Sequence, residues 1–117
     1  MAANKRRGEI AAIIDGQERI LCLTLGALAE LENAFAVEDL TALAQRFSTG
    51  RLSARDLTCV LAAGLRGGGW GVRDDEVAAM KVEGGVSSIA TIVAELLALT
   101  FGVDGAAQTA QENSPDP

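Results

Sequence analysis

GEIAAIIDGQERILCLT, residues 8–24, is the stretch that decides the fold of this 117-residue chain. Two runs rich in isoleucine and leucine flank Asp15 and Gly16, a pair that readily adopts the positive φ angles of a tight turn. An isolated hairpin is marginal in water, so this one must pack on helices or on another chain. With a loop of about four residues, strand alternation puts the large apolar side chains on one face. These side chains are Ile10, Ile14, Leu21 and Leu23.

The sequence after the hairpin predicts helices, because apolar residues recur at helical spacing. Thr24 is suited to cap the first helix, and Ser53 with Asp56 resembles the capping box of the third. We expect a mainly α (α+β) fold, in which the N-terminal β-hairpin is followed by a compact bundle of about five short helices. The helices are expected over about 25–36, 39–47, 54–66, 74–82 and 86–101.

The domain organisation follows from where this periodicity begins and ends. A single domain is expected over 8–101, with the hairpin in 8–24 and the helices in 25–101. Residues 1–7 are basic and are expected to be flexible, and residues 102–117 lose all periodicity and are expected to form a disordered acidic tail.

The composition argues against several classes of function. The net charge is −6, only 3% of residues are aromatic and tyrosine is absent, which is the wrong chemistry for binding nucleic acid. Histidine is also absent, which removes the commonest general base and the commonest metal ligand. We therefore expect no enzyme, no cofactor and no metal site.

The glycine-rich stretch GLRGGGWGVRDDEV, residues 64–77, invites comparison with a phosphate-binding loop. The lysine followed by serine or threonine that such a loop requires is missing, and a helix precedes the glycines where a strand is needed. The favoured interpretation is a helix stop with Gly67 in a left-handed conformation, followed by a helix start capped by Asp74 or Asp75. The stretch is then a candidate hinge formed by Gly67, Gly68, Gly69 and Gly71.

The two cysteines, Cys22 and Cys59, form no CxxC pair, and two buried reduced thiols are expected, with a disulfide left open. The basic run Lys5-Arg6-Arg7 is either a solvated terminus or a contact for an acidic partner. The chain has no signal peptide pattern and no apolar run long enough to span a membrane. It is expected to be cytoplasmic.

Apolar residues exceed what a small core requires, and a protein-binding surface would account for the remainder. The last helix and the hairpin are the candidate locations, although the same side chains serve equally well as core. The candidate partner-binding residues are Ile92, Leu96, Leu99, Leu21 and Leu23.

Several short motifs, taken in order, resemble the small tail-region protein encoded in bacterial gene transfer agents and related prophages. They are RGE at 7–9, LTLGALAELE at 23–32, GRLSARDL at 50–57, LRGGG at 65–69 and VEGG at 82–85. That family is described both as a tail tube protein and as a tail assembly chaperone.

The resemblance implies a role in building a phage-like tail and offers no catalytic residues. A mainly helical, apolar chain favours a tail assembly chaperone that binds the tape measure protein and other tail proteins. The alternative is a structural tail (tube) component, which would be located in the virion. A small enzyme or a nucleic-acid-binding module is a distant third. A homo-oligomer is left open.

Overall fold

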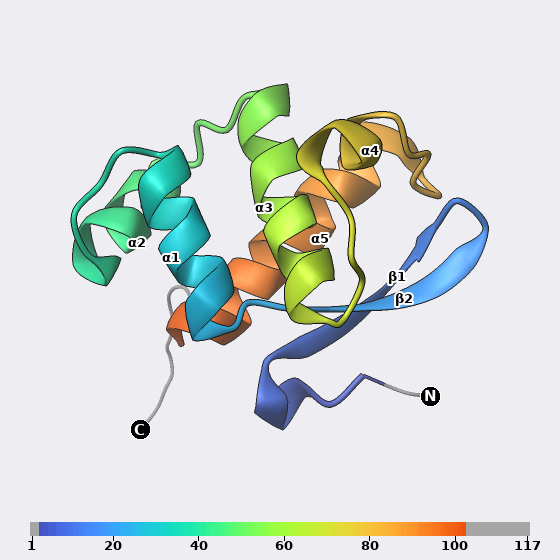
Figure 1. The fold of residues 1–117 in the computed structure, drawn as a ribbon, viewed down its shortest axis with the longest axis horizontal. Helices are drawn as coiled ribbons and strands as arrows, with labels where there is room; N and C mark the ends of the chain where they lie inside the picture. Colours follow the sequence, from blue (N-terminus) through green and yellow to red (C-terminus); the bar gives the residue numbers. More distant parts are fainter. Residues whose placement is uncertain (1–2, 103–117) are drawn as a thin grey trace, which may run out of the picture.

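The computed structural model describes residues 3–102 and confirms the expected fold class, an N-terminal hairpin followed by five helices (Figure 1). Most of the expected acidic tail, residues 103–117, lies outside the described residues. A short 3₁₀ helix occupies part of the segment expected to be flexible. The elements are η1 (Lys5–Arg7), β1 (Glu9–Ile14), β2 (Gln17–Cys22), α1 (Leu25–Ala34), α2 (Leu40–Ser48), α3 (Ala54–Gly67), α4 (Asp74–Ala78) and α5 (Gly85–Phe101).

The turn of the hairpin is formed by Asp15 and Gly16, with φ angles of 53° and 76°. Two consecutive positive φ angles are typical of the tightest hairpin turn, so Ile14 pairs directly with Gln17. The loop therefore has two residues, and the expectation of about four was wrong. The expected apolar face is confirmed, because the side chains that were assigned to it are all buried. They are Ile10, Ile14, Leu21 and Leu23.

The segment after α4 pairs with the outer edge of β1 instead of continuing the helix. Val82 forms an antiparallel bridge with Ile14, and the backbone N–H of Asp15 donates to the carbonyl of Lys81 at 2.7 Å. The Asp15 carboxylate also accepts from the N–H of Lys81 at 2.9 Å. These bonds explain why the helix expected over about 74–82 stops at Ala78.

The starts of α1 and α3 follow the capping signals in the sequence. Thr24 caps α1 by accepting from the N–H of Ala27 at 3.1 Å, and Ser53 with Asp56 forms a complete capping box on α3. The prediction for α4 was wrong, because its N-cap residue is Arg73 and neither following aspartate caps it. The carboxylate of Glu76 accepts from the Arg73 N–H at 2.8 Å instead.

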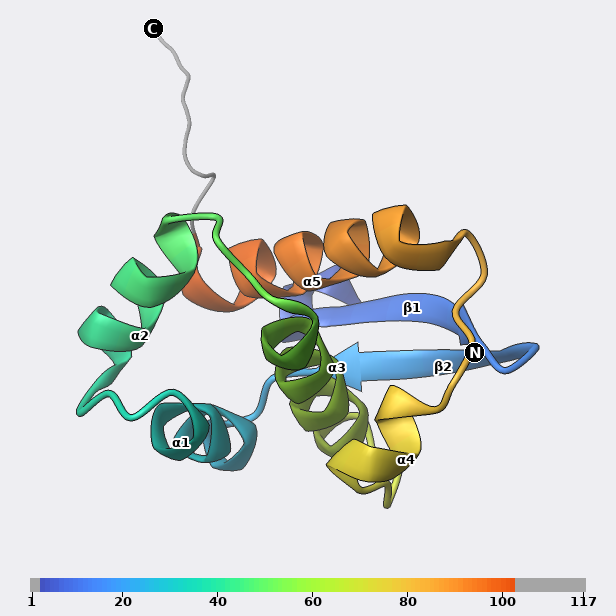
Figure 2. The same cartoon turned by 90° about the horizontal axis from the view of Figure 1, so that it is seen from above.

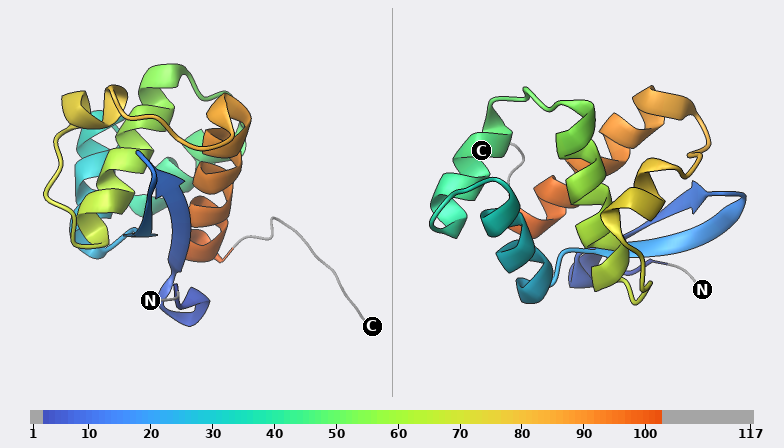
Figure 3. Two further views of the ribbon diagram at one scale, coloured as in Figure 1. Left: turned by 90° about the vertical axis from the view of Figure 1, so that its right-hand side faces the viewer. Right: turned by 45° about the horizontal axis from the view of Figure 1, so that its top comes forward.

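The hairpin lies between α3, which packs beside β2, and α5, which packs beside β1 (Figure 2; Figure 3, left). Gly64 in α3 allows the two sides to meet, since a Cβ there would lie 2.7 Å from a methyl group of Leu96 and 3.2 Å from one of Leu21. Leu96 on α5 and Leu21 on β2 are both fully buried. One hydrophobic core thus joins the hairpin to the helices.

Asp56 ties the start of α3 to α2. Its carboxylate accepts from the Ser53 N–H at 3.0 Å and from the Arg46 guanidinium at 2.8 Å. Partial desolvation acts to raise the pKa of the Asp56 carboxyl, but these hydrogen bonds outweigh it and lower the pKa below its ordinary value. A depressed carboxyl pKa contributes stability that is present above the unfolded-state pKa and is lost as the pH falls through the folded-state pKa.

We expect Asp56→Asn to lower the free energy of unfolding by about 1 kcal/mol at pH 7, because charged hydrogen bonds are weakened. The cost should shrink as the pH falls through the folded-state pKa of the Asp56 carboxyl, which lies below the ordinary value. Urea denaturation at pH 7 and at a series of progressively more acidic pH values measures both effects. Glu38→Gln is the matched control, since Glu38 is exposed and makes no hydrogen bond or ion pair within residues 3–102. Equal effects of the two substitutions at pH 7 would contradict the assignment.

Candidate partner-binding surface

An apolar groove runs between the end of α2 and the C-terminal half of α5. Its volume is about 510 Å³. The α5 side of the groove is a helical stripe of small and large apolar residues, and the opposite side comes from α2, from the loop after it and from α3. The lining includes Phe47, Leu52, Leu57, Ala94, Leu97 and Phe101. A concave apolar surface of this kind is the default binding-site candidate on a small domain.

The open face of α5 differs from the face that the sequence analysis selected. Ile92 and Leu96 are buried in the core, and Leu99 is half-buried against it. Ala94 and Ala98 are exposed on the groove side. The helix is apolar over more than one side, so the sequence identified a candidate helix without separating its two faces.

The hairpin candidates Leu21 and Leu23 also lie in the core, with 0% and 7% of their surfaces exposed. In this conformation a partner cannot reach them. Among residues 3–102, four other large apolar side chains are exposed at scattered positions, and Leu25 and Val86 are the most exposed, at 79% and 74%. The other two are Ile13 and Leu40.

The glycine-rich stretch packs tightly against the hairpin. A Cβ at Gly67 would overlap the backbone carbonyl of Cys22, and a Cβ at Gly68 would overlap that of Ile20. The left-handed residue is Gly69, with φ of 102°, and the expectation that Gly67 would adopt this conformation was wrong. Gly67 and Gly68 are therefore required by the close approach of α3 to the outer edge of β2. Motion at the hinge candidate remains a prediction.

Two side-chain contacts further fix this stretch. The Arg66 guanidinium donates to Glu30 of α1 at 2.7 Å and to Asp74 of α4 at 3.0 Å, so that it joins three helices. The guanidinium of Arg19 lies over the Trp70 ring, 4.7 Å from its centroid. The backbone of this stretch lies against β2, and its side chains form contacts on both sides. The stretch is therefore packed against the rest of the domain.

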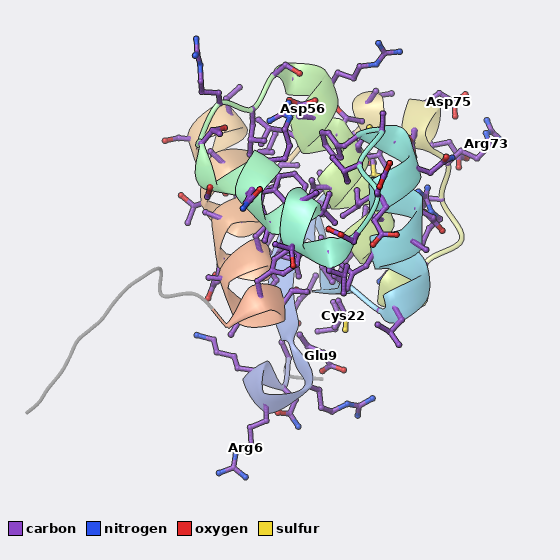
Figure 4. The ribbon with its side chains drawn as sticks, turned by 90° about the vertical axis from the view of Figure 1, so that its left-hand side faces the viewer. Arg6, Glu9, Cys22, Asp56, Arg73 and Asp75 are labelled. Carbon is purple, nitrogen blue, oxygen red and sulfur yellow. The ribbon has the colours of Figure 1, made fainter. Side chains whose placement is uncertain are left out.

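The cysteines are half-buried and unpaired. Burial raises the pKa of the Cys22 thiol, and Glu9 beside it acts in the same direction (Figure 4). Burial is also the main cause that raises the pKa of the Cys59 thiol, and the negative charge of Asp74 raises it further. Both thiols are therefore protonated at neutral pH, which is opposite to the environment of a nucleophilic cysteine.

The acidic and sulfur-containing side chains are dispersed over the described region. Within residues 3–102 no three His, Cys, Asp or Glu side chains are grouped closely enough to hold a metal ion. Arg73 and Asp75 form an ion pair at 3.0 Å on the surface of α4, where both side chains are exposed (Figure 4). Such pairs contribute little to stability. Among the described helices, none is long and apolar enough to cross a membrane.

The similarity to known proteins points to the same kind of particle as the short motifs. A family model described as "Phage tail tube protein, GTA-gp10" matches residues 7–103, which include the hairpin and all five helices. No curated protein matches the chain. No solved structure matches it either. The match extends over most of the sequence, and the chain therefore belongs to the family of the phage tail tube protein GTA-gp10.

Proposed function

We propose that this chain is a structural component of the tail of a phage-like particle, in contact with other tail proteins. The observation that carries the proposal is the family match over residues 7–103. A tube built from one kind of subunit needs contacts between two different surfaces of each copy, so that the assembly continues. The apolar groove between α2 and α5 supplies one such surface, and Leu25 and Val86 supply exposed apolar side chains elsewhere.

The groove is the surface to test. We expect Ala94→Lys to prevent incorporation of the chain into tails, because a long cation would occupy the apolar groove. Its effect on the free energy of unfolding should stay within about 0.5 kcal/mol, since Ala94 is exposed. The measurement is the amount of variant recovered in purified particles when the gene for the wild-type chain is replaced.

Thr91→Lys is the matched control. Thr91 is exposed on the same helix and takes no part in lining the groove. Incorporation of Ala94→Lys at the level of Thr91→Lys would exclude the groove as a tail contact. Loss of both variants would indicate that any added charge on α5 is harmful, and the groove would then carry no special role.

A second function, that of a tail assembly chaperone, is favoured by the shape of the fold. Within residues 3–102 the only sheet has two strands, and the outer edge of β2 is covered by α3. A groove lined by Phe47, Leu97 and Phe101 suits an apolar helix, such as a segment of the tape measure protein. A chaperone would bind that client in cell extracts and be absent from finished particles.

A further inference from the structure

Two arginines beside the groove between α2 and α5 have no acidic partner within residues 3–102. Arg51 is exposed in the loop after α2, and the residues on both sides of it line the groove. Arg55 is exposed in the first turn of α3, shortly before the lining residue Leu57. Arg46, by contrast, is paired with Asp56 at 2.8 Å. The groove therefore has a positively charged border that this part of the chain leaves unbalanced.

The α5 wall of the groove carries no charged side chain. It is formed by Ala90, Ala94, Leu97, Ala98 and Phe101. Among residues 85–101 the sole charged residue is Glu95, which pairs with Lys5 at 3.4 Å. An apolar surface without charge is typical of the centre of a protein contact, and a charged border steers the partner into place. The side chain that fills this groove should therefore be apolar and lie beside carboxylates.

The N-terminal end of α5 has this combination. Val86 is 74% exposed, and Glu83, which shortly precedes it, is also exposed. Glu83 and Glu18 line one hollow at this end of the molecule, and neither takes part in an ion pair within the described part of the chain. Asp15 and Lys81 are exposed there as well, and their charges cancel. This end is therefore apolar at Val86 and acidic beside it.

The other exposed apolar side chains match the groove less well. Leu25 is the most exposed, but no acidic residue occurs among residues 21–29. Leu40 shares one face of α2 with residues that line the groove, so it belongs to the same wall. Ile13 is less exposed and lies at the same end as Val86. Charge therefore selects the end that carries Val86.

The groove and the N-terminal end of α5 lie on opposite sides of the molecule. Figure 2 shows α2 and the C-terminal end of α5 on one side and the N-terminal end of α5 on the other, and Figure 1 agrees. A contact between two such different surfaces is heterologous, so each copy gives one surface and receives the other. A row of copies built in this way can continue, which a repeating structure in a tail requires.

We propose that the groove of one copy holds the N-terminal end of α5 of a second copy. Val86 of the second copy packs on the apolar wall, where Ala94 and Ala98 are small and leave space for it. The Glu83 carboxylate of the second copy then faces the Arg51 guanidinium. This contact rests on the proposed structural role, because it names the tail protein that fills the groove.

Cross-linking in purified particles tests this contact. The gene for the wild-type chain is replaced by one that encodes Val86→Cys together with Ala98→Cys, both at exposed positions. A short bismaleimide should then join the copies into dimers, trimers and longer products, because each copy carries one new thiol at each contacting surface. Each single substitution should give no product beyond the background of wild-type particles, in which Cys22 and Cys59 are half-buried.

Three results would overturn the contact. The first is incorporation of the double variant without the cross-linked series, which would leave the structural role intact. The second is a cross-link from Ala98→Cys to a different tail protein, which would identify another occupant of the groove. The third is absence of the wild-type chain from particles, which would reject the structural role as well.

Charge reversal is a second test, and it decides the matter if the cysteine variants are not incorporated. Glu83→Arg and Arg51→Glu should each lower the amount recovered in particles by about tenfold, because like charges then face each other across the contact. The chain with both substitutions should return to within about threefold of the wild type. Glu38→Arg is the control, since Glu38 is exposed and the change in net charge is the same. Failure of the double substitution to restore recovery would contradict the pairing.

Discussion

Gly67→Ala is expected to destabilise the protein by about 3 kcal/mol or more. Helix propensity alone predicts the opposite sign, since alanine is favoured over glycine inside a helix by about 1 kcal/mol. Packing decides the outcome, because the new methyl group would overlap the Cys22 carbonyl in the backbone of β2. Backbone cannot rotate away as a flexible side chain would, so α3 must move off the hairpin. Urea denaturation with linear extrapolation measures the difference.

Gly71→Ala is the control for this prediction. Nothing lies within 4 Å of a Cβ at Gly71, and its φ angle is outside the left-handed region. Alanine there should leave stability unchanged or raise it by up to about 1 kcal/mol. If Gly67→Ala were as stable as the wild type, the close approach of α3 to β2 would be refuted, and a hinge at Gly67 would become the better explanation.

Leu96→Ala is expected to cost about 3 to 5 kcal/mol, the range for a large side chain removed from a packed core. Leu96 is fully buried, and one of its methyl groups occupies the space that Gly64 leaves on α3. The measurement is again the free energy of unfolding. Leu25→Ala is the control, because Leu25 is 79% exposed and should change stability by no more than about 0.5 kcal/mol.

If Leu96→Ala unfolded at nearly the wild-type urea concentration and yet abolished incorporation into particles, Leu96 would be a partner-binding residue after all. If the substitution instead caused a large loss of stability, a loss of incorporation would follow from the damaged core.

Local signals predicted the presence of the hairpin and the starts of α1 and α3. Asp15-Gly16 fixes a turn, and Thr24 and Ser53 supply side-chain oxygens to helix N-termini, so each decision rests on neighbouring residues. The end of α4 could not be predicted in this way. It depends on Lys81 and Val82 meeting the hairpin, which lies far away in the sequence.

The candidate binding surface was harder to predict for a related reason. Periodicity shows that α5 is apolar, but it does not show which face meets the core. Leu96 and Leu97 are neighbours in sequence, yet Leu96 points into the core and Leu97 lines the groove. The groove also needs Phe47 from α2, and only the three-dimensional fold brings the two helices together. Gly67 was similarly ambiguous, because flexibility and close packing both select glycine.

Quantitative mass spectrometry of purified particles, made by the gene cluster that encodes this chain, tests the central claim most directly. A structural tail component should be present in every particle, in an amount comparable to that of the other major tail proteins. Absence from finished particles, together with binding to the tape measure protein in cell extracts, would contradict the structural role and establish the chain as an assembly chaperone.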